Sequence, residues 1–333
     1  MAPRVSVVIP TYNRTRWLAE TIESVLGQTY ADLELVVGDD ASTKEDAGAV
    51  VARYDDPRLR YVRFDENAGI VRNFNRCIEL AQGDYVLALG DDDAAHPELV
   101  ERTVAVLDAN PEVGVAHTSF DLIGPEGELV HEDVNWTGNL SEDAIESGDE
   151  FVRASMGVSC RICSSTALIR RSALPAGIFD PDEFPPFDFA LWLRMALDWG
   201  FGFIADPLCL YRIHPLSHSS NVATQVPDGY LQSTDMVRAV RDLKVRFVNE
   251  HPDRYPVGEY TAVANRGARR ELLAPVRYTT LPERKFVPTV KGLAAAAREA
   301  PDVLREPAAW SLLAGSLVGP RGVERLRRFK PAG

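Results

Sequence analysis

The chain is poor in cysteine, with only four in 333 residues. That number excludes a fold held together by disulfide bonds, because a framework of this size would need many more. Cys160 and Cys163 form a C-x-x-C pair, which supplies two of the four ligands of a structural zinc, and no second pair follows. A metal-binding or redox pair stays open as an alternative, but we expect two ordinary buried cysteines.

Long hydrophobic runs are absent as well. The early apolar run Val5–Pro10 is too short for a signal peptide and lacks a cleavage site. The longest apolar stretch near the C-terminus, Ala308–Gly319, has about twelve residues, whereas a membrane-spanning helix needs about twenty. We therefore expect a cytoplasmic protein.

Positive net charge and glycine-rich phosphate loops are also missing. The net charge of −13 argues against a general nucleic-acid binder, so we expect no nucleic-acid partner. No G-x-G-x-x-G follows the first apolar run, and no G-x-x-x-x-G-K-[ST] occurs anywhere. Such loops cradle phosphates at a helix N-terminus. A nucleotide bound by this chain would therefore need a metal ion to hold its phosphates.

Short apolar runs alternate with helical patterns through much of the chain. The hydrophobic content of 45% and charged content of 26% are those of a soluble globular protein of about two domains, or of one large α/β domain with an appendage. The expected strands are Val5–Pro10, Leu33–Val37, Arg60–Phe64, Tyr85–Leu89, Val113–Phe120, Ser164–Arg170, Phe201–Ile204 and Leu208–Arg212. Apolar residues recur at helical spacing over Asn73–Gln82, over Asp188–Trp199 and from about Tyr230 onward. This alternation predicts an α/β fold with a mostly parallel central sheet flanked by helices, and a C-terminal helical extension.

Polar clusters follow three of the expected strands. They are Thr11-Tyr12-Asn13, Asp39-Asp40 and Asp91-Asp92-Asp93. Ligands of an open α/β sheet bind outside the carboxyl ends of its strands, so we expect these clusters to form one site. Three adjacent carboxylates repel one another by on the order of 1 kcal/mol per pair even in wet surroundings. A divalent cation would relieve that repulsion, and oxygen ligands suit Mg or Mn. The alternative is an acidic turn that caps the next helix, which Pro97-Glu98 could open.

Five segments, in this order, resemble family 2 glycosyltransferases. They are Val5–Arg14 (VSVVIPTYNR), Gly38–Thr43 (GDDAST), Gly83–Pro97 (GDYVLALGDDDAAHP), Asp188–Arg194 (DFALWLR) and Tyr211–His214 (YRIH). The resemblance covers roughly residues 4–220. It implies the GT-A fold, a Rossmann-like arrangement, and an inverting enzyme that depends on a nucleotide sugar. It also implies a nucleotide-sugar-binding half over 1–110 and an acceptor-binding half over 111–228, followed by the helical extension over 229–333.

The resemblance carries nucleotide-binding positions over to this chain. Those after the first strand are Pro10, Thr11, Tyr12 and Arg14, with the Tyr12 ring able to stack on the base. Asp40, beside Asp39, matches an acid that accepts a hydrogen bond from a pyrimidine N3–H, which favours a UDP- or dTDP-sugar. A turn residue is the alternative for Asp40. Arg72 lies where the family often places an Arg that contacts base or phosphate, and a solvated surface Arg is its alternative.

The same resemblance divides the acidic cluster. Gly90 stands where the family often has a first acid, so Asp91 is expected at the ribose or phosphate and Asp92 is the expected metal ligand. We also count Asp93 among the metal-site residues, although an acid at the start of the next helix is the other interpretation. His214 matches a residue near the diphosphate that can ligate the metal, and a structural His is its alternative.

Asp188 matches the general base of the family. The residue before it is Phe187 here, where much of the family has Glu. Its alternative role is to cap the helix that follows, as its position permits. We expect the apolar neighbours Phe187 and Phe189 to raise its pKa by desolvation.

The resemblance implies a glycosyltransferase of cell-surface polysaccharide or glycolipid synthesis that uses Mn or Mg. The implied partners are a nucleotide sugar and a sugar or lipid-linked sugar acceptor. The alternatives are a non-catalytic nucleotide-sugar-binding scaffold and a sugar nucleotidyltransferase. Residues 283–333 carry ten Lys and Arg against five Asp and Glu, so an apolar helix with a basic end could lie on the inner face of the plasma membrane. Packing on its own domain, or on the second subunit of a homodimer, is the alternative.

Overall fold

The computed structural model describes residues 3–158, 160–214, 217, 223–226, 229–232 and 234–280, and residues 293, 296, 297, 309 and 310. The chain forms two compact units. Unit 1 comprises Met1–Ser155 and Cys160–Ser217, and unit 2 comprises Met156–Ser159 and His218–Gly333. The predicted halves 1–110 and 111–228 both contribute strands to the sheet of unit 1.

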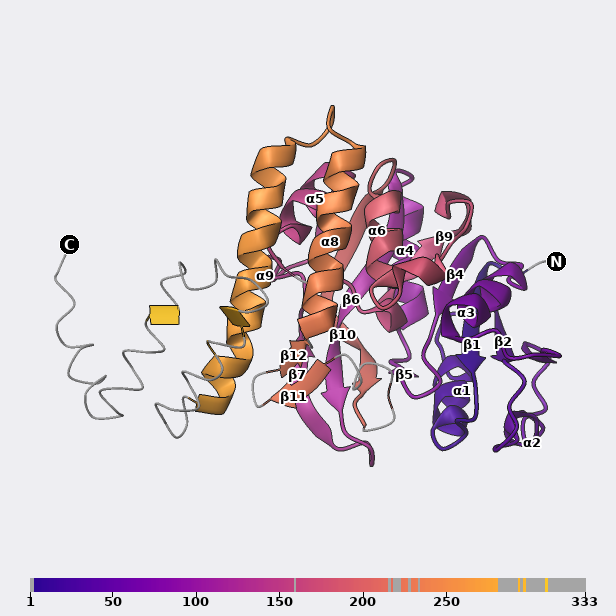
Figure 1. Ribbon diagram of the computed structural model, residues 1–333. Coiled ribbons are helices and arrows are strands. Elements are labelled where there is room, and N and C mark those ends of the chain that lie inside the picture. The colour runs from indigo at the N-terminus through magenta and orange to yellow at the C-terminus, as the bar shows by residue number, and fades with distance from the viewer. Residues whose placement is uncertain are drawn as a thin grey trace. The chain divides into compact units, whose positions relative to one another are not determined.

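The strands of unit 1 form one mixed sheet in the order β3-β2-β1-β4-β9-β6-β10-β5, with β7 paired to β6 and β8 to β10. They are β1 (Val5–Thr11), β2 (Leu33–Asp39), β3 (Leu59–Arg63), β4 (Tyr85–Ala88), β5 (Ala94–Ala95), β6 (Val113–Ile123), β7 (Leu129–Val134), β8 (Ala144–Glu146), β9 (Leu168–Arg170) and β10 (Gly200–Arg212). The helices are α1 (Leu18–Leu26), α2 (Ala47–Val51), α3 (Ile70–Glu79), α4 (Leu99–Ala109), α5 (Gly148–Ser155) and α6 (Phe187–Met195). Figure 1 shows them around the strands.

The order of the first four strands creates a topological switch point. Strands β3, β2, β1 and β4 are parallel neighbours in that order, so the chain grows outward from β1 to β3 and then returns to place β4 on the other side of β1. Right-handed crossovers then put α3 on the opposite face from α1 and α2. In such a sheet the crevice beyond the carboxyl ends of β1 and β4 is where ligands bind.

Burial explains why these segments are strands at the centre of the sheet. Every residue of β1, β2 and β4 is buried, as expected of parallel strands covered on both faces. Helix α1 turns Leu18, Ile22 and Val25 inward at helical spacing. Gly38 is required in β2 because a Cβ there would lie 2.2 Å from the Cys77 Sγ.

Two local expectations are wrong, and a strand also forms where none was expected. Ser164–Thr166 is a turn of 3-10 helix, and only Leu168–Arg170 of the expected strand pairs, antiparallel to β4 and β6. The two short strands expected over Phe201–Arg212 are one strand, β10. The stretch 124–138, which has no clear period in the sequence, contains strand β7.

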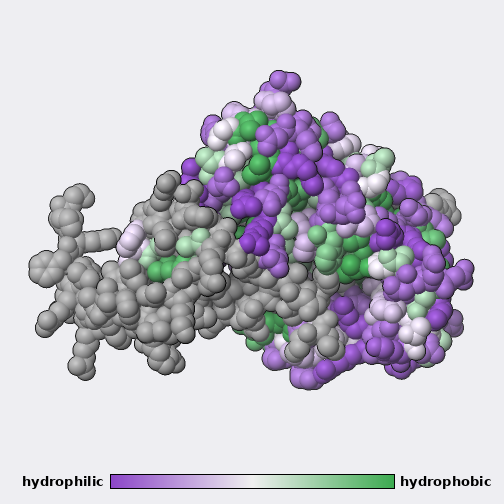
Figure 2. Space-filling view, viewed as in Figure 1, coloured by the Kyte–Doolittle hydropathy of each residue, from purple (hydrophilic) through white to green (hydrophobic). Residues whose placement is uncertain are grey.

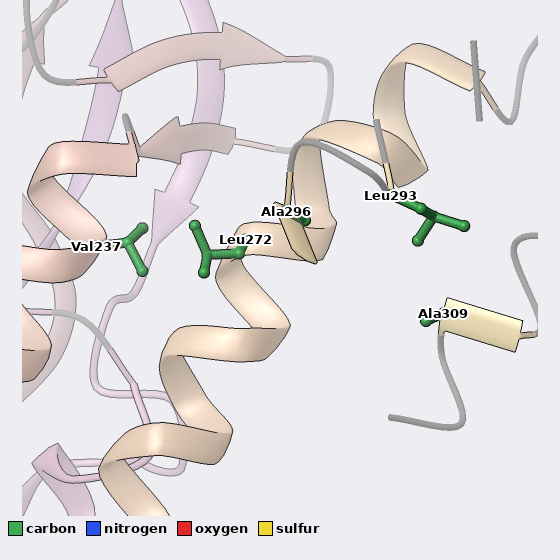
Figure 3. Close-up of a cluster of buried hydrophobic side chains, with 5 residues drawn as sticks. All are labelled: Val237, Leu272, Leu293, Ala296 and Ala309. Atoms are coloured by element: carbon green, nitrogen blue, oxygen red, sulfur yellow. The ribbon is translucent and has the colours of Figure 1, made fainter. Parts of the chain in front are cut away.

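Unit 2 contains a hairpin and two long helices. The hairpin consists of β11 (Ala223–Val226) and β12 (Gly229–Gln232), and the helices are α8 (Thr234–Glu250) and α9 (Val257–Thr280). Figure 3 shows an apolar cluster of this unit, in which Val237 and Leu272 are buried together with Leu293, Ala296 and Ala309. The helical character expected from about Tyr230 is therefore present in α8 and α9, although Tyr230 itself lies in β12.

The visible surface of the described residues is mainly hydrophilic, with apolar residues in small interrupted groups (Figure 2). Among the described helices, none is both long and apolar enough to cross a bilayer.

Candidate active site

The loops after β1 and β2 are bonded to each other at the carboxyl edge of the sheet. Asn13 adopts a left-handed backbone, with φ of 51°, and its side-chain oxygen accepts hydrogen bonds from the amides of Thr43 and Lys44. Its own amide donates to the Ser42 Oγ, at 2.8 Å. Pro10 is buried in β1 opposite Gly38. Of the four residues predicted after the first strand, Pro10 and Thr11 end β1, and Tyr12 and Arg14 lie in the loop that follows it beside the switch point.

The two acids after β2 have different partners. Asp39 accepts hydrogen bonds from the Tyr61 hydroxyl at 2.7 Å and the Ser42 amide at 2.9 Å. Asp40 accepts from the amides of Ala68 and Gly69, one at each carboxylate oxygen and both at 2.9 Å. Asp39 is therefore the turn residue before Ser42, and Asp40 ties down the loop that leads into α3.

Tyr12 and Arg72 are exposed at this edge. Tyr12 is 45% exposed, which leaves an aromatic face available to a planar ligand. Arg72 is in the first turn of α3 and also points its side chain to solvent. Within the described residues it is Arg76, one turn further on, that reaches the Asp40 carboxylate, at 3.4 Å. Arg76 is four residues after Arg72 and so lies on the same face of the helix. This spacing was the sequence feature that could have predicted the contact between Arg76 and Asp40.

Asp91 and Asp92 lie beside the loop after β1. The Thr11 hydroxyl donates to the Asp91 Oδ2 at 2.7 Å, which joins the ends of β1 and β4. The Arg14 Nη1 lies 3.1 Å from the Asp91 Oδ1 and 2.5 Å from the Asp92 Oδ2. The same Asp92 oxygen is 2.9 Å from the Nε2 of buried His214. Residues from positions 11, 14, 91, 92 and 214 therefore meet at one point.

Gly90 makes room for the acids that follow. A Cβ on Gly90 would lie 2.9 Å from carboxylate oxygens of both Asp92 and Asp93. The chain continues from the acids into β5, and α4 begins only at Leu99 with no side-chain cap. The three acids therefore do not cap that helix, and the alternative of a capping turn is wrong.

Asp93 points into the protein. Its Oδ1 accepts from the Arg212 amide at 2.9 Å, and its Oδ2 accepts a short hydrogen bond from the Ser165 hydroxyl. Burial raises the pKa of Asp93 to about 8, and the nearby Asp92 charge adds to that rise. Burial also raises the pKa of Asp91 to about 7, although the Arg14 charge opposes it. The role of Asp93 as a metal ligand stays a prediction.

Arg212 is a site residue that the sequence did not single out. It is buried, its Nε donates to the Asp92 carbonyl at 2.8 Å, and its Nη2 lies 2.6 Å from the Glu20 carboxylate. Trp17 packs its ring on His214, with centroids 4.1 Å apart. The sequence pattern Y-R-x-H led to the prediction of His214. Arg212 stands in the same pattern and could have been predicted as a site residue, but the sequence did not indicate which residues it contacts.

Asp188 lies in the first turn of α6 and is half-buried. Its Oδ2 accepts from the Ser164 hydroxyl at 2.8 Å, and its Oδ1 accepts from the Phe189 amide at 2.7 Å. Burial raises its pKa, and these two hydrogen bonds only partly offset the rise. The cap position of α6 is Pro186, so the alternative role of Asp188 as the helix cap is wrong.

The donor set suits a divalent cation of the Mg or Mn kind. The Asp92 Oδ2 and the His214 Nε2 lie 2.9 Å apart, which is a hydrogen-bond distance, and both atoms are of kinds that can bind such an ion. Across the described part of the chain no three His, Cys, Asp or Glu side chains are arranged to hold a metal. A cation here would therefore take its remaining ligands from water and phosphates, as Mg commonly does.

The C-x-x-C pair stays reduced in the structure. Cys160 and Cys163 are free thiols, Cys163 is buried, and burial raises the pKa of its thiol well above the usual value. A raised pKa keeps the thiol protonated and makes it a poor nucleophile and metal ligand. Cys163 is therefore an ordinary buried cysteine, as expected, whereas Cys160 is only half-buried.

The sequence of this chain matches a known protein family. The family model described as Glycosyl transferase family 2 matches residues 6–176. Chondroitin synthase from Escherichia coli is 32% identical over 135 residues, which are 40% of this chain and 20% of that protein. The chain spans less than half the length of the first curated relatives that it matches.

Two solved structures share the fold. S. aureus TarS 1–349 in complex with UDP has a TM-score of 0.57 at 16% identity, covering 98% of this chain and 92% of that one. Mannosyltransferase PcManGT from Pyrobaculum calidifontis, in complex with GDP-Man and Mn2+, has a TM-score of 0.52 at 19% identity, covering 99% and 89%. The GT-A fold expected from the sequence is confirmed.

Proposed function

Because this chain belongs to glycosyl transferase family 2, we propose that it moves a sugar from a nucleoside diphosphate sugar to an acceptor hydroxyl, with inversion at the anomeric carbon. One observation carries the proposal. The loops after β1 and β4 converge on Asp92, and the consecutive residues Ser164 and Ser165 bond to Asp188 and Asp93. The turn Ser164–Thr166 therefore links the acid cluster, where the donor would bind, to Asp188, which would act as the base.

Asp188 is the base in this proposal. An acceptor hydroxyl is a poor nucleophile at neutral pH, and a carboxylate within hydrogen-bond reach takes its proton as the anomeric carbon is attacked. The raised pKa of Asp188 favours that transfer because a stronger base holds the proton better. Attack opposite the leaving group in a single displacement gives inversion.

The leaving group is a nucleoside diphosphate, held in this proposal at the carboxyl edge of β1 and β4. The exposed Tyr12 ring stacks on the base, and the Asp40 Oδ2, which accepts from a single amide, also accepts from a pyrimidine N3–H. Asp40 is buried, so the loop over it must open for this contact. Arg14 and the exposed Arg72 bring positive charge to the phosphates. A Mn or Mg ion at Asp92 and His214 would neutralise the charge that develops on the diphosphate.

The donor is a UDP- or dTDP-sugar in this proposal, and the product belongs to a polysaccharide or glycolipid. TarS is solved with UDP and PcManGT with GDP-Man, so related folds accept both kinds of nucleotide. Chondroitin synthase supports a role in polymer synthesis, because its name states that product. The sugar acceptor, free or linked to a lipid, approaches Asp188.

Replacing Asp188 by Asn tests the proposal. We expect transfer to fall by about 10² to 10⁴-fold, because the amide cannot take the acceptor proton, while binding of UDP stays unchanged. The measurement is release of UDP, dTDP or GDP from a panel of sugar nucleotides with Mn or Mg, with EDTA as the metal-free control.

Asp182→Asn is the matched control, since Asp182 is exposed and lies six residues earlier. It should keep wild-type turnover. Asp188→Asn turnover above a few per cent of wild type contradicts the role of Asp188. Nucleotide binding without turnover in the wild type would instead favour a scaffold, and pyrophosphate release from a nucleoside triphosphate would favour a nucleotidyltransferase.

A further inference from the structure

The acid cluster already holds a cation of its own, the guanidinium of Arg14. One nitrogen, Nη1, contacts both Asp91 and Asp92, at 3.1 and 2.5 Å. A guanidinium stays protonated at any ordinary pH. The guanidinium is therefore a fixed positive charge at this point.

Arg14 and a divalent cation need the same oxygen. The Asp92 Oδ2 that Arg14 contacts is also the oxygen that faces the His214 Nε2, the other side chain that would hold the ion in the proposed function. A guanidinium and a divalent cation on one oxygen repel each other strongly, because their centres would lie only a few ångströms apart. Binding of the ion therefore requires the Arg14 side chain to move.

The backbone at Arg14 is held in place, whereas its side chain is free to change position. The residue before Arg14, Asn13, is held in place because its side-chain oxygen accepts hydrogen bonds from the amides of Thr43 and Lys44. The side chain has one quarter of its surface exposed. A diphosphate offers it a better partner, since guanidinium groups bind phosphate oxygens in pairs of parallel hydrogen bonds.

We propose that Arg14 is an exchangeable counter-ion. It occupies Asp92 while the donor site is empty, and it transfers to the diphosphate when a nucleotide binds, which frees Asp92 for the divalent cation. Cation and nucleotide then bind cooperatively, and the cation alone binds weakly. This inference rests on the proposed function, because it assumes that nucleoside diphosphate and metal share this site.

Mn2+ binding to the full chain tests the exchange without turnover. Free Mn2+ is counted from its electron paramagnetic resonance signal, with and without UDP, for the wild type and for Arg14→Met. We expect UDP to tighten Mn2+ binding to the wild type by about tenfold or more, within the usual range of coupling between sites. Arg14→Met should bind Mn2+ alone about tenfold tighter than the wild type, and UDP should then add less.

Two further variants sharpen the result. Arg16 lies two residues after Arg14, is exposed and pairs with Glu126. The control variant Arg16→Met should therefore bind Mn2+ as the wild type does. Arg14→Gln removes the charge but keeps a hydrogen-bond donor, and it replaces Arg14→Met if that variant does not fold. Both neutral variants of Arg14 should bind Mn2+ alone more tightly.

The proposal is overturned if a folded neutral variant binds Mn2+ alone no more tightly than the wild type does. That result leaves the proposed function intact, provided UDP still binds and donor turnover still needs the metal. A lack of Mn2+ binding in every variant, even with UDP, overturns both the exchange and the metal dependence. The two failures are therefore distinguishable.

Discussion

Two neighbouring hydroxyl groups, on Ser164 and Ser165, bond to carboxylates from distant parts of the sequence. Ser164 donates to Asp188, the proposed base, and Ser165 donates to Asp93 of the acid cluster. Because both residues lie on one turn of 3-10 helix, the spacing between base and acid cluster depends on that turn. Each hydroxyl therefore helps to hold its acid in place and lowers the pKa of that acid against the larger effect of burial.

Ser164→Ala tests this at the scale of one residue. The hydrogen bond from Ser164 stabilises the ionised form of Asp188 and lowers its pKa against the effect of burial. Without it the pKa of Asp188 rises further, and since the base acts when ionised, activity is lost at a higher pH as the pH falls. We expect the acidic limb of the kcat–pH profile to move to higher pH, with several-fold lower kcat at mildly acidic pH and little change in alkaline solution.

Ser164→Thr is the matched control, because it keeps the hydroxyl. It should restore the wild-type profile. An unchanged acidic limb in Ser164→Ala would mean that this hydrogen bond does not tune Asp188.

Helix α9 shows how a whole element depends on its neighbour. Unit 2 includes the short segment Met156–Ser159 as well as the C-terminal part of the chain. Gly267 of α9 lies against this segment, and a Cβ on Gly267 would lie 2.8 Å from the Gly157 carbonyl oxygen. The buried Lys244 of α8 donates to the Val158 carbonyl in the same segment. Within unit 2, close backbone contact therefore joins α9 to residues more than 100 positions earlier.

Two glycines of α9 should respond in opposite ways to alanine. Gly267→Ala places a Cβ against backbone and should lower the free energy of unfolding by about 1–3 kcal/mol. Gly258→Ala meets nothing within 4 Å at an exposed position, and should raise it by up to about 1 kcal/mol, because alanine is the better helix former. Urea denaturation of both variants measures the difference. Equal shifts would show that the contact with Gly157 is not tight.

At the scale of the whole molecule, the C-terminal region has two predicted partners. The basic residues near the end, including Arg325, Arg327 and Arg328, lie outside the described residues, and membrane contact stays a prediction. Of the apolar residues further back, Leu293, Ala296 and Ala309 are buried together with Val237 and Leu272 in unit 2. These three side chains already have protein contacts, which supports packing for this part of the region. The predicted homodimer also stays a prediction.

Replacing Arg325, Arg327 and Arg328 by Gln tests the membrane contact and leaves the apolar residues of the region unchanged. Each basic residue near an anionic surface contributes about 1 kcal/mol. We therefore expect binding to vesicles that contain anionic lipid to fall by about tenfold or more in a flotation assay. Thermal melting checks that the variant is folded, and the wild type with neutral vesicles is the control. Unchanged binding to anionic vesicles would contradict a membrane contact.

The sequence by itself determined the parts of this protein that depend on local pattern. Apolar runs such as Val5–Pro10 and Tyr85–Leu89 became buried parallel strands, and their carboxyl ends brought Thr11 and Asp91 within hydrogen-bond distance. Strand alternation, five ordered segments and the family resemblance were enough for the GT-A fold, because each is set by neighbouring residues or by position along the chain.

Only the tertiary structure decided which charges face one another. The contact between Ser165 and Asp93 spans 72 positions, and the Arg212 amide reaches Asp93 across 119. The family resemblance assigned roles to the three acids but no partners within the protein. Folding brought Asp91 to Thr11 and Arg14, Asp92 to Arg14 and His214, and Asp93 to buried hydrogen bonds. Such pairings follow from how distant segments pack, since hydrogen bonds act only at contact, and no local pattern records them.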